Sequence, residues 1–176
     1  MAISLLAKEL DALRKVSTPA ICDAIDSFNV RPRNEGFMAS GIRCIFPELG
    51  SMVGYAVTAR IMTDEPPAEG HQVSRLDWWD FLQGIPKPRV VVVQDLDRMI
   101  RGTYWDQQTV HIHKALGCVG VVTDGGVRDL DVMHVAPGVH RERGVEPRRQ
   151  RQGRAARPAV AGPERRGQGL ELPADG

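Results

Sequence analysis

Hydrophobic residues in the first 134 positions switch between two spacings, one typical of helices and one typical of strands. Segments that read as helices are 4–16, 18–28, 72–83 and 106–116. Segments with strict alternation or a short β-branched apolar run are 53–61, 89–94 and 118–123. Strands that alternate with helices are typical of an α/β domain, which is the fold class we predict.

Turn and cap residues set the predicted boundaries of these elements. Thr18 is expected to cap the second helix, with Pro19 at the first helical position. Residues 36–50 are expected to be irregular, because turn residues stand at both ends. A glycine pair predicts a turn at 124–126, and a further helix is expected over 127–134.

The last 42 residues differ from the rest of the chain in composition. Residues 1–134 carry 14 Lys and Arg against 17 Asp and Glu, whereas residues 135–176 carry nine Arg and no Lys against five acids. Arg, Gly, Ala and Pro dominate this tail, which has no Ile, Phe, Tyr or Trp. Such a segment buries too little apolar surface to offset the entropy lost on ordering it. We therefore predict an α/β domain over 1–134 and a tail over 135–176 that is disordered or out of frame.

Three hypotheses account for the tail. Its dominant residues are encoded by codons with only G and C in the first two positions, so the reading frame could shift between Met133 and Arg148. The fold would then be incomplete at its C-terminal end. A natural disordered extension is the second hypothesis. An RNA-binding arm is the third, although no aromatic residue interleaves with the arginines to stack bases, so nucleic acid is not the expected partner.

Simple features exclude several classes of protein. The longest apolar run, Val90–Val93, is far shorter than the roughly 20 residues that span a membrane. Lys8 and Glu9 interrupt the N-terminus where a secretory signal would stay apolar. Three cysteines without a CxxC motif argue against a disulfide framework or a zinc site. A cytoplasmic location is therefore expected.

The most informative chemistry follows the strand predicted at 118–123. A glycine pair ends this strand and leads to Arg128 and Asp129. Arg128 has a planar guanidinium that suits a carboxylate or phosphate, and Asp129 is a hard oxygen ligand that suits Mg²⁺ or Mn²⁺. In the alternative reading, Asp129 opens a helix and favours its dipole, while Arg128 pairs with a surface acid.

A second strand end carries acids as well. Asp95 and Asp97 follow the strand at 89–94, and Asp106 is the first residue of the helix predicted at 106–116. A helix N-terminus presents N–H groups that can bind an anion. The alternative is a capped helix with solvated acids.

These two strand ends together resemble the RraA-like family. The resemblance rests on DGGVRD at 124–129, the preceding segment 112–122, STPAICDAI at 17–25 and GYAVTAR at 54–60. It covers residues 4–134 in order. It implies an α/β/β domain of the swivelling type, assembled as a homo-trimer or hexamer with sites between subunits.

The resemblance also implies a lyase that depends on Mg²⁺ or Mn²⁺, of the class II (metal-dependent) aldolase or oxaloacetate decarboxylase type. Family members include 4-hydroxy-4-methyl-2-oxoglutarate aldolases that also decarboxylate oxaloacetate. Arg128 would bind the carboxylate of the small α-keto acid and Asp129 would ligate the metal. Residues Gln107, Gln108 and Thr109 would bind substrate, largely through backbone amides, and cleavage would leave a pyruvate enolate.

One departure from the family pattern bears on activity. Gln107 stands where the family has Glu or Asp, and Asp106 stands where it has Gly. Gln lacks the charge that helps to hold a metal-bound water, and Asp106 replaces it as a metal ligand only if the backbone shifts by one residue. Whether the chain is an enzyme therefore stays open. The alternative is a regulatory protein that binds a ribonuclease, as RraA itself does.

Overall fold

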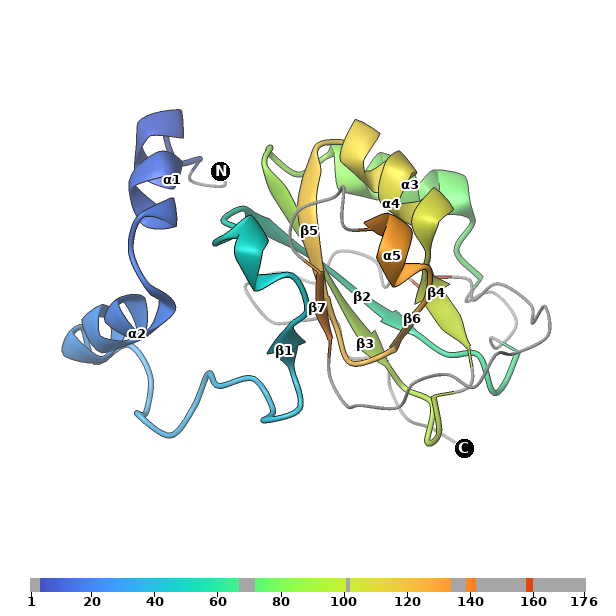
Figure 1. Ribbon diagram of the computed structural model, residues 1–176, viewed down its shortest axis with the longest axis horizontal. Coiled ribbons are helices and arrows are strands. Elements are labelled where there is room, and N and C mark those ends of the chain that lie inside the picture. The colour runs from blue at the N-terminus through green and yellow to red at the C-terminus, as the bar shows by residue number, and fades with distance from the viewer. Residues whose placement is uncertain (1–3, 67–71, 101, 134–138, 142–157, 160–176) are drawn as a thin grey trace.

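The structure is a computed structural model, and it describes residues 4–66, 72–100, 102–133, 139–141 and 158–159 (Figure 1). Its helices are α1 (Ala7–Arg14), α2 (Thr18–Ser27), α3 (Arg75–Gln83), α4 (Gln107–Ala115) and α5 (Leu130–Met133), with a 3₁₀ turn, η1, at Pro47–Leu49. Its strands are β1 (Arg43–Cys44), β2 (Tyr55–Ile61), β3 (Arg89–Asp95), β4 (Thr103–Trp105), β5 (Cys118–Thr123), β6 (Gly126–Val127), β7 (Val139–Arg141) and β8 (Pro158–Ala159). None of the described helices is long and apolar enough to cross a membrane.

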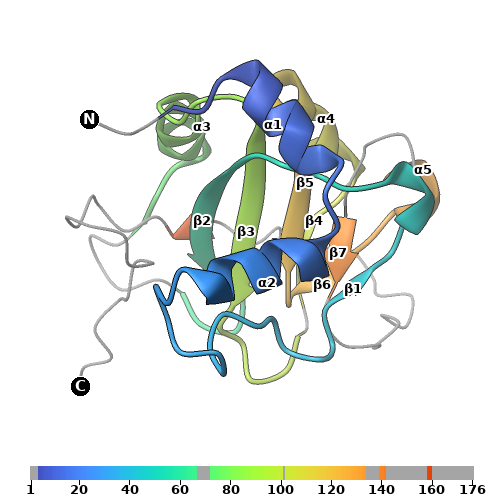
Figure 2. The ribbon, with the colours of Figure 1, turned by 90° about the vertical axis from the view of Figure 1, so that its left-hand side faces the viewer.

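The main sheet confirms the predicted α/β class. Its strand order is β1-β7-β5-β3-β2-β8, and the central pairs β2·β3, β3·β5 and β5·β7 are parallel. Helices α3, α4 and α5 lie on one side of this sheet, and α1 and α2 lie on the other, as the two views show (Figures 1 and 2). A second, two-stranded sheet pairs β4 with β6.

The core lies between the sheet and the helices α3 and α4. The apolar runs of β3 and β5 are β-branched rather than alternating, as is typical of strands in parallel sheets. The buried side chains of this core include Val57, Ile61, Val91, Val93, Val121, Trp78, Leu82 and Val110.

A buried cation joins two helix ends to the sheet. Arg89 is 4% exposed, and its Nε and Nη2 donate to the carbonyls of Ile85 (2.6 Å) and Gln83 (2.9 Å). Its Nη1 donates to the carbonyl of Leu116 at the end of α4. The guanidinium therefore satisfies carbonyls that the helix ends leave without intrahelical partners.

Two predicted helix boundaries are wrong. Ser17, not Thr18, caps α2, because its Oγ accepts the Ala20 N–H at 3.4 Å. The helix predicted from residue 127 begins at Leu130, because residues 126–127 form β6 instead. Strands β4 and β6 are too short for periodicity to predict them.

Only two pieces of the predicted tail lie within the described residues. Residues 139–141 form β7 beside β5, and residues 158–159 form β8 beside β2. The rest of 135–176 lies outside the described residues. The predicted boundary at residue 134 stays a prediction.

Candidate functional site

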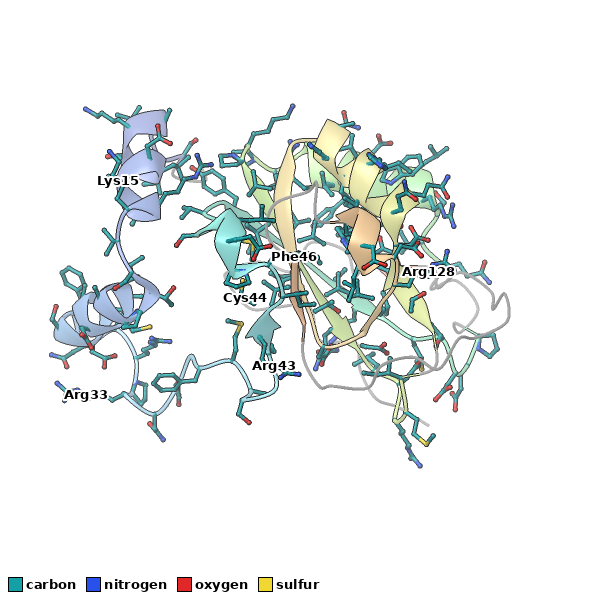
Figure 3. All side chains as sticks on the ribbon, viewed as in Figure 1. Lys15, Arg33, Arg43, Cys44, Phe46 and Arg128 are labelled. Atoms are coloured by element: carbon teal, nitrogen blue, oxygen red, sulfur yellow. The ribbon has the colours of Figure 1, made fainter. Side chains whose placement is uncertain are left out.

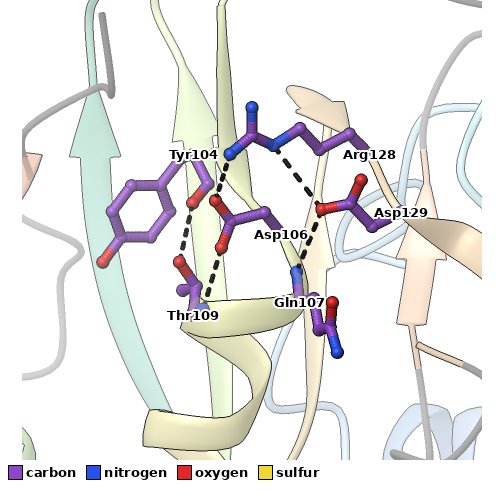
Figure 4. A network of polar contacts seen from close by, with 6 residues as sticks. All are labelled: Tyr104, Asp106, Gln107, Thr109, Arg128 and Asp129. Atoms are coloured by element: carbon purple, nitrogen blue, oxygen red, sulfur yellow. Dashed lines mark hydrogen bonds and ion pairs between the residues drawn. The ribbon is translucent and has the colours of Figure 1, made fainter. Parts of the chain in front are cut away.

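The register of the small sheet brings the two predicted site segments together. β4 and β6 are parallel, Trp105 pairs with Val127, and the Arg128 N–H donates to the Trp105 carbonyl at 3.1 Å. The next residue of each strand is Asp106 in one case and Arg128 in the other. These two side chains therefore leave neighbouring strands at the same end (Figure 4).

An arginine between two carboxylates forms the centre of the site. Arg128 Nη2 lies 2.7 Å from Asp106 Oδ2, and Arg128 Nε lies 3.7 Å from Asp129 Oδ2. The side chains of Arg128, Asp106 and Asp129 are 52%, 17% and 42% exposed. The guanidinium is thus open to solvent while Asp106 is largely covered.

Asp106 also caps α4. Its Oδ1 accepts the Thr109 N–H at 2.8 Å, and the Thr109 hydroxyl donates to the Tyr104 carbonyl at 3.3 Å. The Gln107 N–H reaches Asp129 Oδ2 at 3.5 Å. Of the amides predicted to bind substrate, that of Thr109 is therefore engaged by the cap and that of Gln107 faces Asp129.

The protonation state of Asp106 follows from these contacts. Burial raises the pKa of its carboxyl, but the hydrogen bonds from Thr109 and Arg128, with the positive charge of Arg128, together outweigh burial. The pKa of Asp106 therefore lies below its ordinary value. Asp106 is ionised at neutral pH, and its charge is favourable at the N-terminus of a helix.

Asp129 stands at a turn of the backbone. Its φ of +62° lies in the left-handed region, which Asp tolerates better than most residues. Its carbonyl accepts the Met133 N–H at 3.1 Å, so α5 begins directly after it. Asp129 is thus held between β6 and α5, not within the first turn of a helix that starts at residue 127.

Two carboxylates of the site are hard oxygen donors of the kind that Mg²⁺ prefers. They belong to Asp129 and Asp106. No group of three or more His, Cys, Asp or Glu side chains that could hold a metal ion occurs in the part of the chain that the structure describes. Such an ion would therefore take its remaining ligands from water and substrate, as Mg²⁺ commonly does.

A second acidic cluster lies at the ends of β3 and β5. The Asp95 N–H donates to Asp124 Oδ1 at 2.6 Å, and the Asp97 N–H donates to Asp95 Oδ1 at 3.0 Å. Asp97 in turn accepts the Thr63 N–H at 2.8 Å. Burial, with the charges of Asp97 and Asp124, raises the pKa of Asp95 to about 6.

His113 supports α4 from within the core. Trp78 Nε1 donates to His113 Nε2 at 2.9 Å, so the ring proton sits on Nδ1, which donates to the Thr109 carbonyl at 2.8 Å. Burial lowers the pKa of His113 to about 4, which keeps the ring neutral. His111 is exposed on the same helix. His113 is a core residue that positions the helix bearing Thr109.

The structure identifies the acid that pairs with Arg128 as Asp106. The alternative reading of the sequence, in which Arg128 pairs with a surface acid, did not specify which acid. The signal is the matched position of the two residues, each directly after a short strand. That signal becomes visible only once β4 and β6 are known to pair.

Comparison with known proteins identifies related families and folds. The family model RraA-like, described as Aldolase/RraA, matches residues 18–162. No curated protein sequence matches this chain. The matched region includes both segments of the site.

Solved structures with a similar fold share little sequence with this chain. A structure described as novel cellulases from gut-associated microbes superposes with a TM-score of 0.63 at 22% identity, over 81% of this chain and 61% of that one. An uncharacterized protein from Pseudomonas syringae pv. tomato gives 0.57 at 21%, over 91% and 66%.

A third solved structure has a description that names its family. Streptomyces coelicolor RraAS2, described as an unusual member of the RNase ES inhibitor RraA protein family, gives a TM-score of 0.54 at 23% identity, over 78% of this chain and 63% of that one. This chain thus spans slightly less than two thirds of the length of each of these structures. At these identities, the likeness shows the fold alone.

Proposed function

The chain belongs to the RraA-like family, and from that premise we propose that it is a divalent-metal-dependent lyase. Its substrates would be small α-keto acids of the 4-hydroxy-4-methyl-2-oxoglutarate or oxaloacetate type, cleaved or decarboxylated through a pyruvate enolate. One observation carries the proposal. The half-exposed guanidinium of Arg128 lies beside the carboxylate of Asp129, so a group that binds carboxylates adjoins one that binds hard cations.

Each side chain of the site has a proposed role. Arg128 binds the substrate carboxylate through the guanidinium N–H groups that face solvent. Asp129 holds Mg²⁺ or Mn²⁺, and Asp106, predicted from the sequence as a second metal ligand, instead pairs with Arg128 and caps α4. Gln107, Gln108 and Thr109 orient the substrate at the N-terminus of α4. A metal bound here would supply Lewis-acid polarisation of the α-keto oxygen.

The absence of an acid at position 107 predicts slow turnover. Gln107 is exposed, and its amide carries no charge with which to accept a proton. Asp106 is charged, but its two carboxylate oxygens already accept hydrogen bonds from Arg128 and from the Thr109 N–H. General base catalysis contributes typically 10²- to 10⁴-fold. We therefore expect measurable but weak lyase activity.

The direct test is release of pyruvate from oxaloacetate with and without Mg²⁺. We expect Mg²⁺-dependent release that Arg128→Ala abolishes. The exposed acid Asp23 on α2 gives a matched control, because Asp23→Asn removes a charge far from the site (Figure 1). A folded wild-type chain with no Mg²⁺-dependent release, or an Arg128→Ala variant that keeps it, would overturn the proposal.

The oligomeric state and the cellular location of the enzyme are also part of the proposal. We expect a homo-trimer or hexamer in the cytoplasm. The alternative is a regulatory protein that binds a ribonuclease, and the match to a family described as Aldolase/RraA supports it. Specific, Arg128-independent binding of a purified ribonuclease, without turnover of oxaloacetate, would replace the lyase with this alternative.

A further inference from the structure

A carboxylate of the chain itself already binds the arginine of the proposed site. We infer that Asp106 acts as an intramolecular carboxylate that competes with ligand carboxylates for Arg128, and so determines how tightly the site binds α-keto acids. This inference rests on the proposed function, because it assigns the affinity of that same site to one residue. Asp106 would then set the affinity of the site for carboxylate ligands.

The geometry shows which part of the guanidinium is occupied. Asp106 accepts from Nη2, and Asp129 approaches Nε, so both carboxylates lie along the Nε–Nη2 edge of Arg128. This edge is one of the two that can bind a carboxylate in bidentate fashion. Toward the described residues, Nη1 makes no hydrogen bond or ion pair. A ligand is thereby confined to the Nη1–Nη2 edge.

The negative charges of Asp106 and Asp129 also weaken the binding of a ligand carboxylate to Arg128. Asp106 and Asp129 bring two negative charges to the single positive charge of Arg128. The Asp106 carboxylate is held in place by the Thr109 N–H at 2.8 Å and by Arg128 Nη2 at 2.7 Å. A ligand carboxylate on Arg128 would thus lie close to a fixed like charge, which weakens its binding.

Loss of the contact between Asp106 and Arg128 affects ligand binding in two opposed ways. The relief of like-charge repulsion has a larger effect than the loss of order in the Arg128 side chain. Without Asp106, Arg128 loses a partner that orders its side chain, which weakens ligand binding by a small factor. Removal of a fixed, largely covered negative charge from beside the ligand strengthens binding more, because the like charges lie close together in partly desolvated surroundings. The expected net effect is roughly tenfold tighter binding, which corresponds to about 1.4 kcal/mol.

The test is calorimetric titration of the full chain with pyruvate at pH 7.5 in the presence of Mg²⁺. Asp106→Asn keeps a side-chain oxygen for the helix cap but removes the charge. We expect it to bind pyruvate about tenfold more tightly than wild type, with no change in Asp23→Asn. The gain should vanish in an Arg128→Met background, because it acts through the guanidinium. Asp106→Ser, which also caps a helix, replaces Asp106→Asn if the latter is misfolded.

A second measurement needs no ligand. Phenylglyoxal modifies accessible arginines, and the rate at Arg128 can be followed by mass spectrometry of peptides. We expect Asp106→Asn to increase this rate severalfold and Asp23→Asn to leave it unchanged. An unchanged rate would contradict the inference by showing that Asp106 does not restrict Arg128.

The outcomes separate the inference from the proposed function. If wild type binds pyruvate through Arg128 and Asp106→Asn binds it equally or more weakly, the inference fails and the proposed function stands. If no folded variant binds pyruvate while Arg128 becomes more reactive in Asp106→Asn, the proposed function fails and only the occupation of Arg128 remains.

Discussion

Asp95 ends β3 in the main sheet and Asp106 follows β4 in the small sheet, yet the pKa values of these two aspartates move in opposite directions. Burial and neighbouring acids raise the pKa of Asp95 to about 6. For Asp106, Arg128 and the Thr109 N–H outweigh burial and lower the pKa. A strand end therefore does not fix the chemistry of the acid that follows it. The cations and N–H groups that face the carboxylate determine whether its pKa is raised or lowered.

The same comparison separates the two clusters as candidate ligand sites. Asp95, Asp97 and Asp124 make no ion pair with any cation among the described residues, so their surroundings disfavour an anionic ligand. The cluster at Asp106 contains Arg128, which can bind a carboxylate. Figure 3 shows Arg128 on the body of the molecule, well away from Lys15 and Arg33 on the N-terminal segment. The proposed α-keto acid site is therefore the one at the ends of β4 and β6.

Substitution of Gly126 or Gly125 perturbs the Arg128 cluster or the Asp95 cluster separately. The largest expected change in the free energy of unfolding comes from Gly126. A Cβ on Gly126 would lie 2.6 Å from the Gly102 carbonyl, against backbone beside β4. A Cβ on Gly125 would lie 2.9 Å from Asp95 Oδ2, a side-chain atom rather than a backbone atom. We expect Gly126→Ala to lower the free energy of unfolding by about 1–3 kcal/mol, and Gly125→Ala by less.

Urea unfolding of the two variants provides the measurement. Gly126→Ala should also weaken pyruvate binding, because it disturbs the β4·β6 register that places Asp106 beside Arg128. Gly125→Ala should leave that binding intact. Equal losses of binding in both variants would contradict the separation of the two clusters.

Asp95→Asn should stabilise the protein at high pH. Because the folded pKa of Asp95 exceeds the ordinary 3.8, the folded state binds more protons than the unfolded state between pH 3.8 and about 6. Its contribution to stability is therefore lost as the pH rises through this window. Allowing for its partial exposure, we expect a gain of about 1–2 kcal/mol at pH 8 and none below pH 4. Urea unfolding at both pH values checks this, and a gain that does not depend on pH would contradict it.

Asp106→Ala should have the opposite sign. It removes the cap of α4, and such caps are worth about 1 kcal/mol. Asp106→Asn retains a capping oxygen, so we expect it to lose only a few tenths of that amount. Thermal unfolding at pH 7 measures the difference. Equal destabilisation by the two substitutions would show that the charge, and not the cap, dominates.

Arg128→Met should have the smallest effect on stability. The Arg128 side chain is half exposed, so we expect a change of less than about 0.5 kcal/mol. The same substitution should raise the pKa of Asp106, because it removes a hydrogen bond and a positive charge. Carbon-13 NMR titration of the aspartate carboxyls measures this directly. A pKa of Asp106 that stays unchanged would mean that Arg128 does not control it.

The sequence predicts the large elements of the fold because their patterns are long. The β-branched runs that become β3 and β5, and the alternation that becomes β2, are confirmed as parallel strands. The family resemblance is confirmed as well. A periodic pattern can be recognised only over several residues, so the sequence did not predict the three-residue β4 or the two-residue β6.

The same limit applies to the site. The adjacency of Arg128 and Asp129 can be read from the chain, but their contact with Asp106 depends on the register of β4 against β6. The raised pKa of Asp95 depends on burial, which arises only when β2, β3 and β5 pack together. Long-range register and desolvation are properties of the assembled fold, so local sequence does not reveal them.

We propose that the cluster around Arg128, and not the cluster around Asp95, binds the α-keto acid. The measurement is amide chemical-shift mapping of the nitrogen-15-labelled chain with pyruvate and Mg²⁺. We expect shifts at residues 107–109 and at Arg128 and Asp129, and none of them in Arg128→Met. Shifts confined to residues 95–97 and Asp124 would contradict it.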